Sequence, residues 1–114
     1  SSPSTSFDCS GFVYWVYNNA DVETKTTVPS TSSSGMYSAL DDYMVGRSIQ
    51  SIGKARTGDI LFFKYGGRVS HVGIYYKDGK MIHAANPRKD VCIEKVSNYN
   101  KWGYKVVGIA RVLK

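Results

Sequence analysis

The order of the secondary-structure signals along the chain limits its fold more than any other feature of the sequence. Helical spacing of apolar residues occurs near the start, where Phe12, Val13 and Val16 follow a Ser- and Thr-rich lead-in. From about residue 59 onward the pattern changes to short apolar strands separated by Gly, Asn, Asp or Pro. Consecutive strands joined by short turns cannot be parallel. The sequence therefore predicts an α+β fold, with N-terminal helices packed on an antiparallel β-sheet.

The boundaries of the elements follow from the same signals. We expect a first helix from about Cys9 to Tyr17 and a second short helix from Met36 to Met44, separated by a surface loop that ends in possible N-caps. Trp15, in the first helix, is expected to pack in the core. The strands are expected, in chain order, at residues 59–63, 72–76, 80–84, 91–96 and 105–112.

Size and charge narrow the class of protein. A chain of 114 residues, 42% of them apolar, suits a single domain over residues 1–114. No apolar run approaches the roughly 20 residues that cross a bilayer, and no charged start followed by an apolar stretch resembles a secretion signal. Because the sequence starts without Met, we expect a fragment of a longer parent. The net charge of +6 favours an anionic partner, and charge alone leaves nucleic acid, a membrane surface and a cell wall open.

Two cysteines are present, and Cys9 is the candidate nucleophile. It stands where the first helix is expected to start, so the helix dipole would favour its thiolate, and its backbone N–H would be a donor to an oxyanion. The structural alternative for a single cysteine is a small buried hydrophobe. Cys92 alternates with Val91 and Ile93 in an expected strand, so we interpret it as structural.

The chain contains two histidines, His71 and His83, and both lie in one expected hairpin. If the hairpin turned on two residues, Asp78 and Gly79, the imidazoles would project from opposite faces of the sheet. With a three-residue loop that starts at Lys77 and places Gly79 in the left-handed conformation, Gly73 lies opposite His83 and both imidazoles share one face. The apolar residues of both strands then turn together to the other face. The pattern therefore favours the bulged turn.

A thiol, an imidazole and a third polar group form the general arrangement for nucleophilic acyl transfer. We predict that Cys9 attacks, that His71 is the general base, and that His83 orients His71 while staying neutral. A catalytic zinc is the rival chemistry for the same three residues. No CxxC, HxH or HExxH spacing supports it, so we expect neither a metal nor a cofactor.

Several motifs resemble those of the NlpC/P60 peptidase family in order and spacing. These are Phe7-Asp8-Cys9-Ser10-Gly11-Phe12-Val13, Thr57-Gly58-Asp59-Ile60-Leu61-Phe62-Phe63, His71-Val72-Gly73-Ile74-Tyr75 and Met81-Ile82-His83-Ala84. The resemblance implies a papain-like fold and hydrolysis of the bond between D-glutamate and a diamino acid in peptidoglycan stem peptides. It also implies that Asp8 and Ser10 contact the substrate. The Tyr-x-Trp-Gly-Gly-like stretch that precedes this region in the family, with a tyrosine that lines the active site there, is absent from the sequence. We expect either that the fragment was cut within the domain or that the site is incomplete.

Three alternatives stay open. The same cysteine and histidines would serve an amidase or acyltransferase, and the missing upstream stretch is compatible with an inactive module that binds the cell wall. Nucleic-acid binding rests on charge and tyrosine content alone, so we expect no nucleic-acid partner. From the resemblance we expect peptidoglycan stem peptides as the partner, a secreted or cell-wall location, no membrane span and a monomer.

Overall fold

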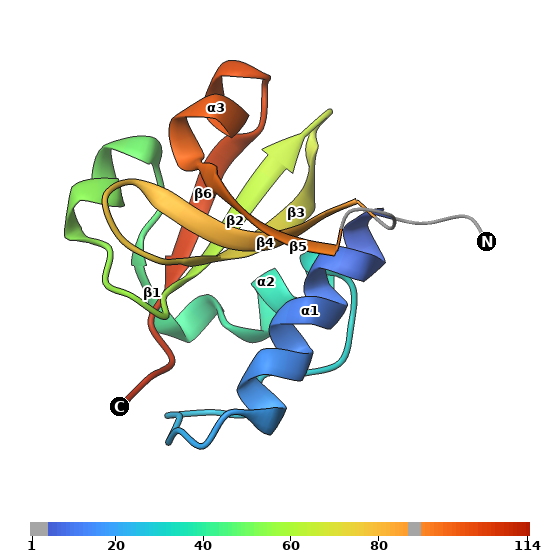
Figure 1. The fold of residues 1–114 in the computed structure, drawn as a ribbon, viewed down its shortest axis with the longest axis vertical. Coiled ribbons are helices and arrows are strands. Elements are labelled where there is room, and N and C mark those ends of the chain that lie inside the picture. Colours follow the sequence, from blue (N-terminus) through green and yellow to red (C-terminus); the bar gives the residue numbers. More distant parts are fainter. Residues whose placement is uncertain (1–4, 87–89) are drawn as a thin grey trace.

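The computed structural model describes the backbone of residues 5–86 and 90–114 and the side chains of residues 9–84 and 91–114. Its elements follow one another along the chain (Figure 1). They are α1 (Thr5–Asn19), α2 (Ser33–Ala39), the 3₁₀ helix η1 (Asp41–Tyr43), β1 (Met44–Gly46), the 3₁₀ helix η2 (Ile49–Lys54), β2 (Ile60–Tyr65), β3 (Arg68–Tyr75), β4 (Lys80–Asn86), β5 (Asp90–Lys95), α3 (Val96–Lys101) and β6 (Lys105–Ala110).

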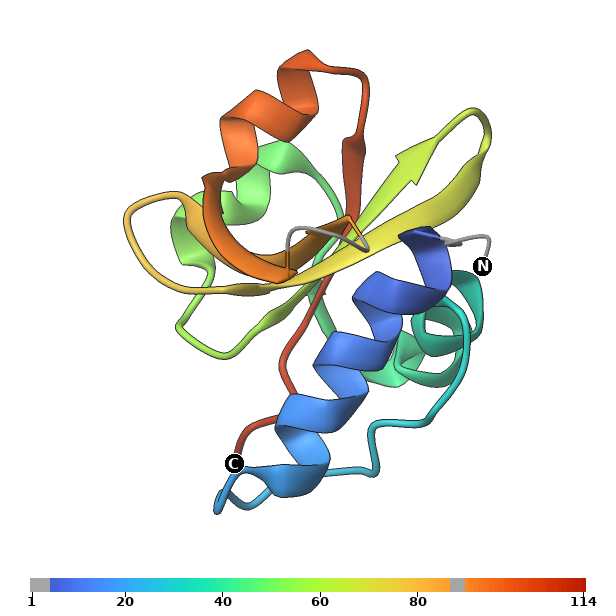
Figure 2. The same ribbon diagram turned by 45° about the vertical axis from the view of Figure 1, so that its right-hand side comes forward.

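The strands form one sheet in the order β1-β6-β2-β3-β4-β5, and every neighbouring pair is antiparallel. Strands β2 to β5 follow one another as a meander, and β6 returns to pair with β2 on its other side. Figures 1 and 2 show α1 and α2 on one side of the sheet, with α3 and η2 on the other. The predicted α+β fold, with N-terminal helices on an antiparallel sheet, is confirmed.

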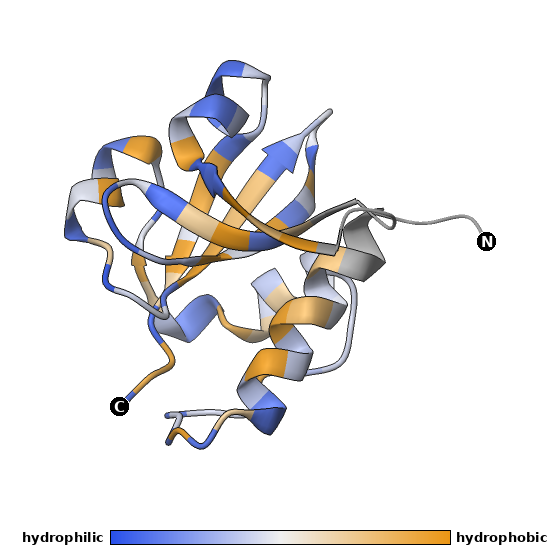
Figure 3. Ribbon diagram, viewed as in Figure 1, coloured by the Kyte–Doolittle hydropathy of each residue, from blue (hydrophilic) through white to orange (hydrophobic). Residues whose placement is uncertain are grey.

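Both faces of the sheet are covered, and β2 shows how the sequence produces this. Its first four residues, Ile60 to Phe63, are all fully buried although strand side chains alternate between faces. Ile60 and Phe62 pack under α1 and α2, in one cluster with Val13, Met36, Leu40, Val72 and Ile74. Leu61 and Phe63 pack under α3 and η2, in a second cluster with Tyr75, Met81, Val96, Val106 and Ile109. Apolar residues accordingly gather along the strands and α1 in Figure 3.

Several expected boundaries differ from the observed ones for local reasons. The Ser-rich loop does end in an N-cap, because the hydroxyl of Ser32 accepts a hydrogen bond from the backbone N–H of Gly35 at 3.1 Å. The second helix stops at Ala39, well before Met44, which instead starts β1 and pairs with Ala110. Helix α3 was expected as a strand and a loop. Its six residues are too few to show helical periodicity.

An ion pair that the sequence did not predict joins the start of β2 to the residue after β6. Asp59 is almost completely buried, and its carboxylate accepts hydrogen bonds from Arg111 at 2.7 and 3.0 Å and from the backbone N–H of Arg56. This pair holds the end of the chain against the sheet. Within the described part of the chain, no helix is long and apolar enough to cross a membrane.

Candidate active site

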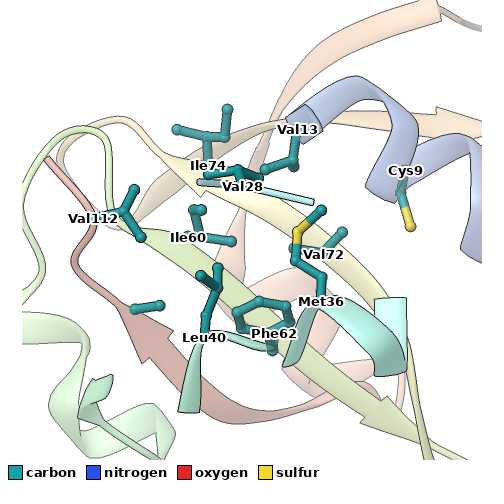
Figure 4. Packing of buried hydrophobic residues seen from close by; sticks show 11 residues of the cluster. Cys9, Val13, Val28, Met36, Leu40, Ile60, Phe62, Val72, Ile74 and Val112 are labelled. Carbon is teal, nitrogen blue, oxygen red and sulfur yellow. The ribbon is translucent and has the colours of Figure 1, made fainter. Parts of the chain in front are cut away.

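Cys9 lies in α1, where this helix packs on β3 and β4. Its side chain has no exposed surface and stands at the edge of the cluster that contains Val72 (Figure 4). The Sγ atom lies 3.3 Å from the Oγ of Ser33 and within hydrogen-bonding reach of the backbone at Val72. Burial raises the pKa of the Cys9 thiol above its ordinary value, although these hydrogen bonds oppose the rise. The resting thiol is therefore protonated at neutral pH.

The expectation that the first helix starts at Cys9 is wrong. Helix α1 begins at Thr5, so one full turn precedes Cys9. Residues 5–8 contain no Gly or Pro, and Ser and Thr favour the first positions of a helix, so nothing delays its start. The four amides without an intrahelical partner are then those of residues 5–8, and the amide of Cys9 is the fifth. The structure therefore does not place Cys9 at the helix end, where the predicted lowering of its pKa and its role as an oxyanion donor would arise.

The register of the β3–β4 hairpin agrees with the prediction that puts both histidines on one face. Ile74 pairs with Ile82 and Tyr75 with Met81, so Gly73 lies opposite His83. The turn itself differs in detail. Asp78 and Gly79 both have positive φ, 54° and 74°, as in a two-residue type I′ turn. Lys77 is the extra residue, because Lys80 bonds both to Tyr76 and to Lys77. This bulge restores the register that a plain two-residue turn would have lost.

Two backbone features bring the imidazoles together. Ser70 is an extra residue in β3, because Phe63 pairs with His71 and Lys64 with Val69. Such a bulge bends the strand and increases its twist right beside His71. Gly73 leaves room for His83, since a Cβ on Gly73 would lie 3.2 Å from the Cβ of His83. The diagonal pair can therefore approach within contact distance.

His71 and His83 form a direct hydrogen bond, with 2.8 Å between Nε2 of His71 and Nδ1 of His83. Their rings are nearly perpendicular, and both side chains are buried. Burial, with a smaller contribution from His83, lowers the pKa of His71 to about 3. Burial also lowers the pKa of His83 to about 4, against the opposing effect of Glu94. Both imidazoles are therefore neutral at physiological pH, so one of the two facing nitrogens carries the shared proton.

Cys92 was interpreted as structural, and the structure gives it a polar contact that the sequence analysis missed. It pairs with His83 across β4 and β5, and its Sγ lies 3.7 Å from Nε2 of His83. Neither cysteine is in a disulfide. The register of β4 and β5 could have revealed this contact, because residues that pair directly share one face.

Tyr99, in α3, is a second residue that sequence reasoning missed. Its ring stacks on His71 with centroids 4.9 Å apart and planes 20° from parallel, and it meets His83 edge-on at 5.0 Å. Burial is the largest of several causes that raise the pKa of Tyr99 to about 12, and a negative charge on Cys9 is one of the others. An ionised Cys9 would therefore act on the ring that stacks on His71. Val72, whose backbone the Cys9 thiol reaches, follows His71 directly.

The structure does not test the substrate contacts that were expected of Ser10 and Asp8. Ser10 is fully buried beside Cys9 and makes contacts of its own, so its predicted role stays a prediction. Asp8 belongs to α1, and its side chain lies outside the described residues. Among the residues that the structure describes, no three His, Cys, Asp or Glu side chains converge to hold a metal ion.

A cysteine-bearing helix packed on an antiparallel sheet that carries a histidine pair defines a papain-like α+β domain. The chain belongs to the NlpC/P60 family, whose model matches residues 1–111. It is 35% identical to the murein DD-endopeptidase MepH of Escherichia coli over 99% of the chain, and 38% identical to a probable endopeptidase p60 of Listeria grayi over 96%. It spans only 39% and 18% of the lengths of these relatives. A solved NlpC/P60 family protein from Bacillus cereus superposes with a TM-score of 0.65 at 30% identity, covering 94% of this chain and 32% of that one.

Proposed function

We propose that the domain hydrolyses peptidoglycan as a cysteine endopeptidase that cleaves stem peptides, with Cys9 as nucleophile, His71 as general base and His83 as the residue that orients His71. The observation that carries the proposal is the 2.8 Å hydrogen bond between the two buried imidazoles on β3 and β4, the strands on which the helix that bears the thiol packs. The names of the relatives, a murein DD-endopeptidase and a probable endopeptidase, support the substrate class.

The proposed mechanism starts from a neutral thiol and a neutral imidazole, the forms that the pKa values of Cys9 and His71 favour. Nδ1 of His71 accepts the thiol proton as Sγ of Cys9 attacks the peptide carbonyl. Nε2–H of His71 donates to Nδ1 of His83, which keeps Nδ1 of His71 unprotonated before the attack. The imidazolium then protonates the leaving amine, and water hydrolyses the resulting thioester with His71 again as base.

Tyr99 supports the charged stage of this cycle. The imidazolium of His71 forms under a nearly parallel tyrosine ring at 4.9 Å, where the face of the ring attracts a cation. The attraction acts on the charged form of His71, so it stabilises the imidazolium that forms when the thiol proton is transferred. It lowers the barrier that the low resting pKa of His71 imposes on proton transfer.

Two bonds are candidates for the cleavage. We favour the bond between D-glutamate and the diamino acid of the stem, as the family resemblance implies. The name of the Escherichia coli relative supports a bond between two D-configured centres as the second candidate. Mass spectrometry of muropeptides after digestion of purified cell walls distinguishes them, because each cleavage releases fragments of different mass. If digestion releases neither set of fragments, both candidate bonds are contradicted.

The amidase, acyltransferase and inactive-module alternatives are tested with the same substrate. Cys9→Ala should abolish wall digestion, whereas an inactive module would leave wild type and variant equally without products. An amidase would release whole stems from the glycan, and an acyltransferase would need an added amine to form product. We also propose a secreted or cell-wall location and a monomer, which fractionation of the source cells and sedimentation of the purified domain would test.

A further inference from the structure

Four aromatic residues form a contiguous surface that begins at the histidine pair and leads away from it. We call this set, Tyr65, Tyr99, Trp102 and Tyr104, the aromatic platform. Tyr99 contacts Trp102 at 5.3 Å and Tyr104 at 5.0 Å between ring centroids, and Tyr104 stacks on Tyr65 at 4.6 Å with planes 18° apart. Every ring in the set therefore touches another member.

The platform is built by the way α3 ends. Gly103 has a φ of 98°, a left-handed conformation that glycine adopts without steric cost. The N–H of Gly103 donates to the carbonyl of Asn100, and the N–H of Tyr104 donates to that of Tyr99. These two bonds form a Schellman motif, which brings the residue after the glycine back onto the last turn of the helix. Tyr104 consequently packs on Tyr99, and Trp102 stands beside them.

The two outer rings of the platform are exposed, and the two rings between them, Tyr99 and Tyr104, are half-buried and pack against the second core cluster. Trp102 is 55% exposed and Tyr65 is 51% exposed, whereas Phe63, which also contacts Tyr99, is fully buried. Large rings at these two positions expose apolar surface to water and do not fill the interior. Contiguous exposed aromatic residues commonly mark a binding surface.

The platform is continuous with the candidate active site. Tyr99 stacks on His71, and Tyr104 meets the same imidazole edge-on at 6.1 Å. A substrate whose reacting bond lies at His71 must therefore extend either over these rings or away from them. In Figures 1 and 2, α3 lies on the side of the sheet opposite α1, so the platform residues of α3 belong to that side.

We propose that the aromatic platform binds sugar rings of the glycan strand, so that the enzyme recognises stem peptides while they are still attached to glycan. This inference rests on the proposed function, because it extends the substrate of that site. A pyranose ring presents a flat face of C–H groups that packs on an exposed aromatic face, while its hydroxyl and acetamido groups remain in water. The tyrosine hydroxyls at the rim of the platform offer hydrogen bonds to those groups. Binding energy from this remote part of the substrate would position the stem at His71.

The test compares two substrates that differ only in the glycan. One is a soluble synthetic stem peptide, and the other is the same stem attached to a glycan oligosaccharide. We expect Trp102→Ala to lower kcat/KM for the glycan-linked stem, relative to the free stem, by about tenfold, the factor that corresponds to about 1.4 kcal/mol. Trp15→Ala is the matched control, because Trp15 is 61% exposed on the outer side of α1 and should leave the ratio unchanged.

The outcomes separate this inference from the proposed function. An unchanged ratio in Trp102→Ala overturns the inference, and an equal loss on both substrates assigns the platform to the peptide instead. If the wild type cleaves neither substrate, the proposed function fails while the platform remains testable. In that case the Cys9→Ala protein is titrated with a stem-free oligosaccharide of N-acetylated amino sugars. Quenching of tryptophan fluorescence that disappears in Cys9→Ala/Trp102→Ala supports the inference, and its absence in Cys9→Ala overturns it.

Discussion

Nε2 of His71 and Nδ1 of His83 lie 2.8 Å apart, so the orientation of one imidazole depends on the other. For Nδ1 of His71 to accept a proton from a thiol, Nε2 of His71 must carry the hydrogen of this bond, and His83 must accept it. The proposed mechanism therefore requires that the hydrogen bond runs from His71 as donor to His83 as acceptor. In the proposed mechanism, His83 is a positioning residue that acts through His71.

Substitution of His83 tests this direction. Asn retains an acceptor oxygen, and we expect His83→Asn to keep a measurable fraction of kcat. His83→Ala leaves the Nε2–H of His71 without its partner, so we expect kcat to fall by about 10²-fold or more, within the range for lost acid–base organisation. Steady-state kinetics on purified muropeptides measure both, and circular dichroism verifies the fold. If both variants kept the kcat of the wild type, His83 would have no role in the mechanism.

The low pKa values of the two histidines predict how stability depends on pH. Folding lowers the pKa of His71 from 6.5 to about 3 and that of His83 from 6.5 to about 4. Between about pH 6.5 and pH 4 the unfolded chain binds protons that the folded chain does not, so stability falls as the pH falls. Each histidine contributes up to about 1.4 kcal/mol per pH unit to this slope.

Urea denaturation at pH 7.5, 5.5 and 4.5 measures this slope. Carboxylates also titrate in acid, so the informative quantity is the difference between wild type and a variant in which His83 is replaced by Gln. That variant should lose less stability on acidification, because one depressed group has been removed. A steeper acid loss in His83→Gln than in wild type would show that the folded state does not disfavour the charged imidazole.

Gly73 is predicted to be needed for activity because the space beside its Cα is too small for a side chain. A Cβ there would lie 2.9 Å from Sδ of Met81 and 3.2 Å from Cβ of His83, and no unusual φ is involved. Met81 is flexible and can yield, whereas His83 is held by its hydrogen bond. We expect Gly73→Ala to fold but to lower kcat by about tenfold, since small displacements of positioned groups cost large factors. Gly53→Ala, with open space at its Cβ, is the control.

The histidine pair could be predicted because it depended on one discrete alternative. Strand side chains alternate strictly, so a one-residue change in the turn moves His83 to the other face. The apolar residues Val72 and Ile74 identified the correct register, although the turn reaches it through a bulge at Lys77. The alternation of apolar residues predicts which face of the sheet a side chain lies on. It does not predict the dihedral angles of the turn.

Other parts of the site depended on contacts that no local pattern contains. The start of α1 depends on residues 5–8, whose sequence permits a helix without requiring one. The expected helix start at Cys9 was therefore about one turn too late. Trp15 was expected in the core, yet it is 61% exposed, because α1 buries the opposite face through Cys9 and Val13. Tyr99 reaches His71 only because the short helix α3 crosses the face of the sheet opposite α1.

Cys92 provides the last prediction. If Nδ1 of His83 accepts the hydrogen from His71, then His83 carries its own hydrogen on Nε2, which faces Sγ of Cys92 at 3.7 Å. Cys92 would then accept this hydrogen bond and stabilise the tautomer that the mechanism requires. Cys92→Val keeps the volume but has no acceptor, so we expect kcat to fall about fivefold, the equivalent of one hydrogen bond of about 1 kcal/mol. Cys92→Ser, which keeps an acceptor, should lose less.

Nitrogen NMR of the imidazoles separates this role from packing. In wild type, the ¹⁵N shifts of His83 should report hydrogen on Nε2, and in Cys92→Val they should move toward a mixture of tautomers. A purely structural cysteine would change the unfolding free energy and leave the tautomer unchanged. If the Val and Ser variants have equal kcat and identical imidazole shifts, the thiol has no part in orienting His83, and the interpretation of Cys92 as structural stands.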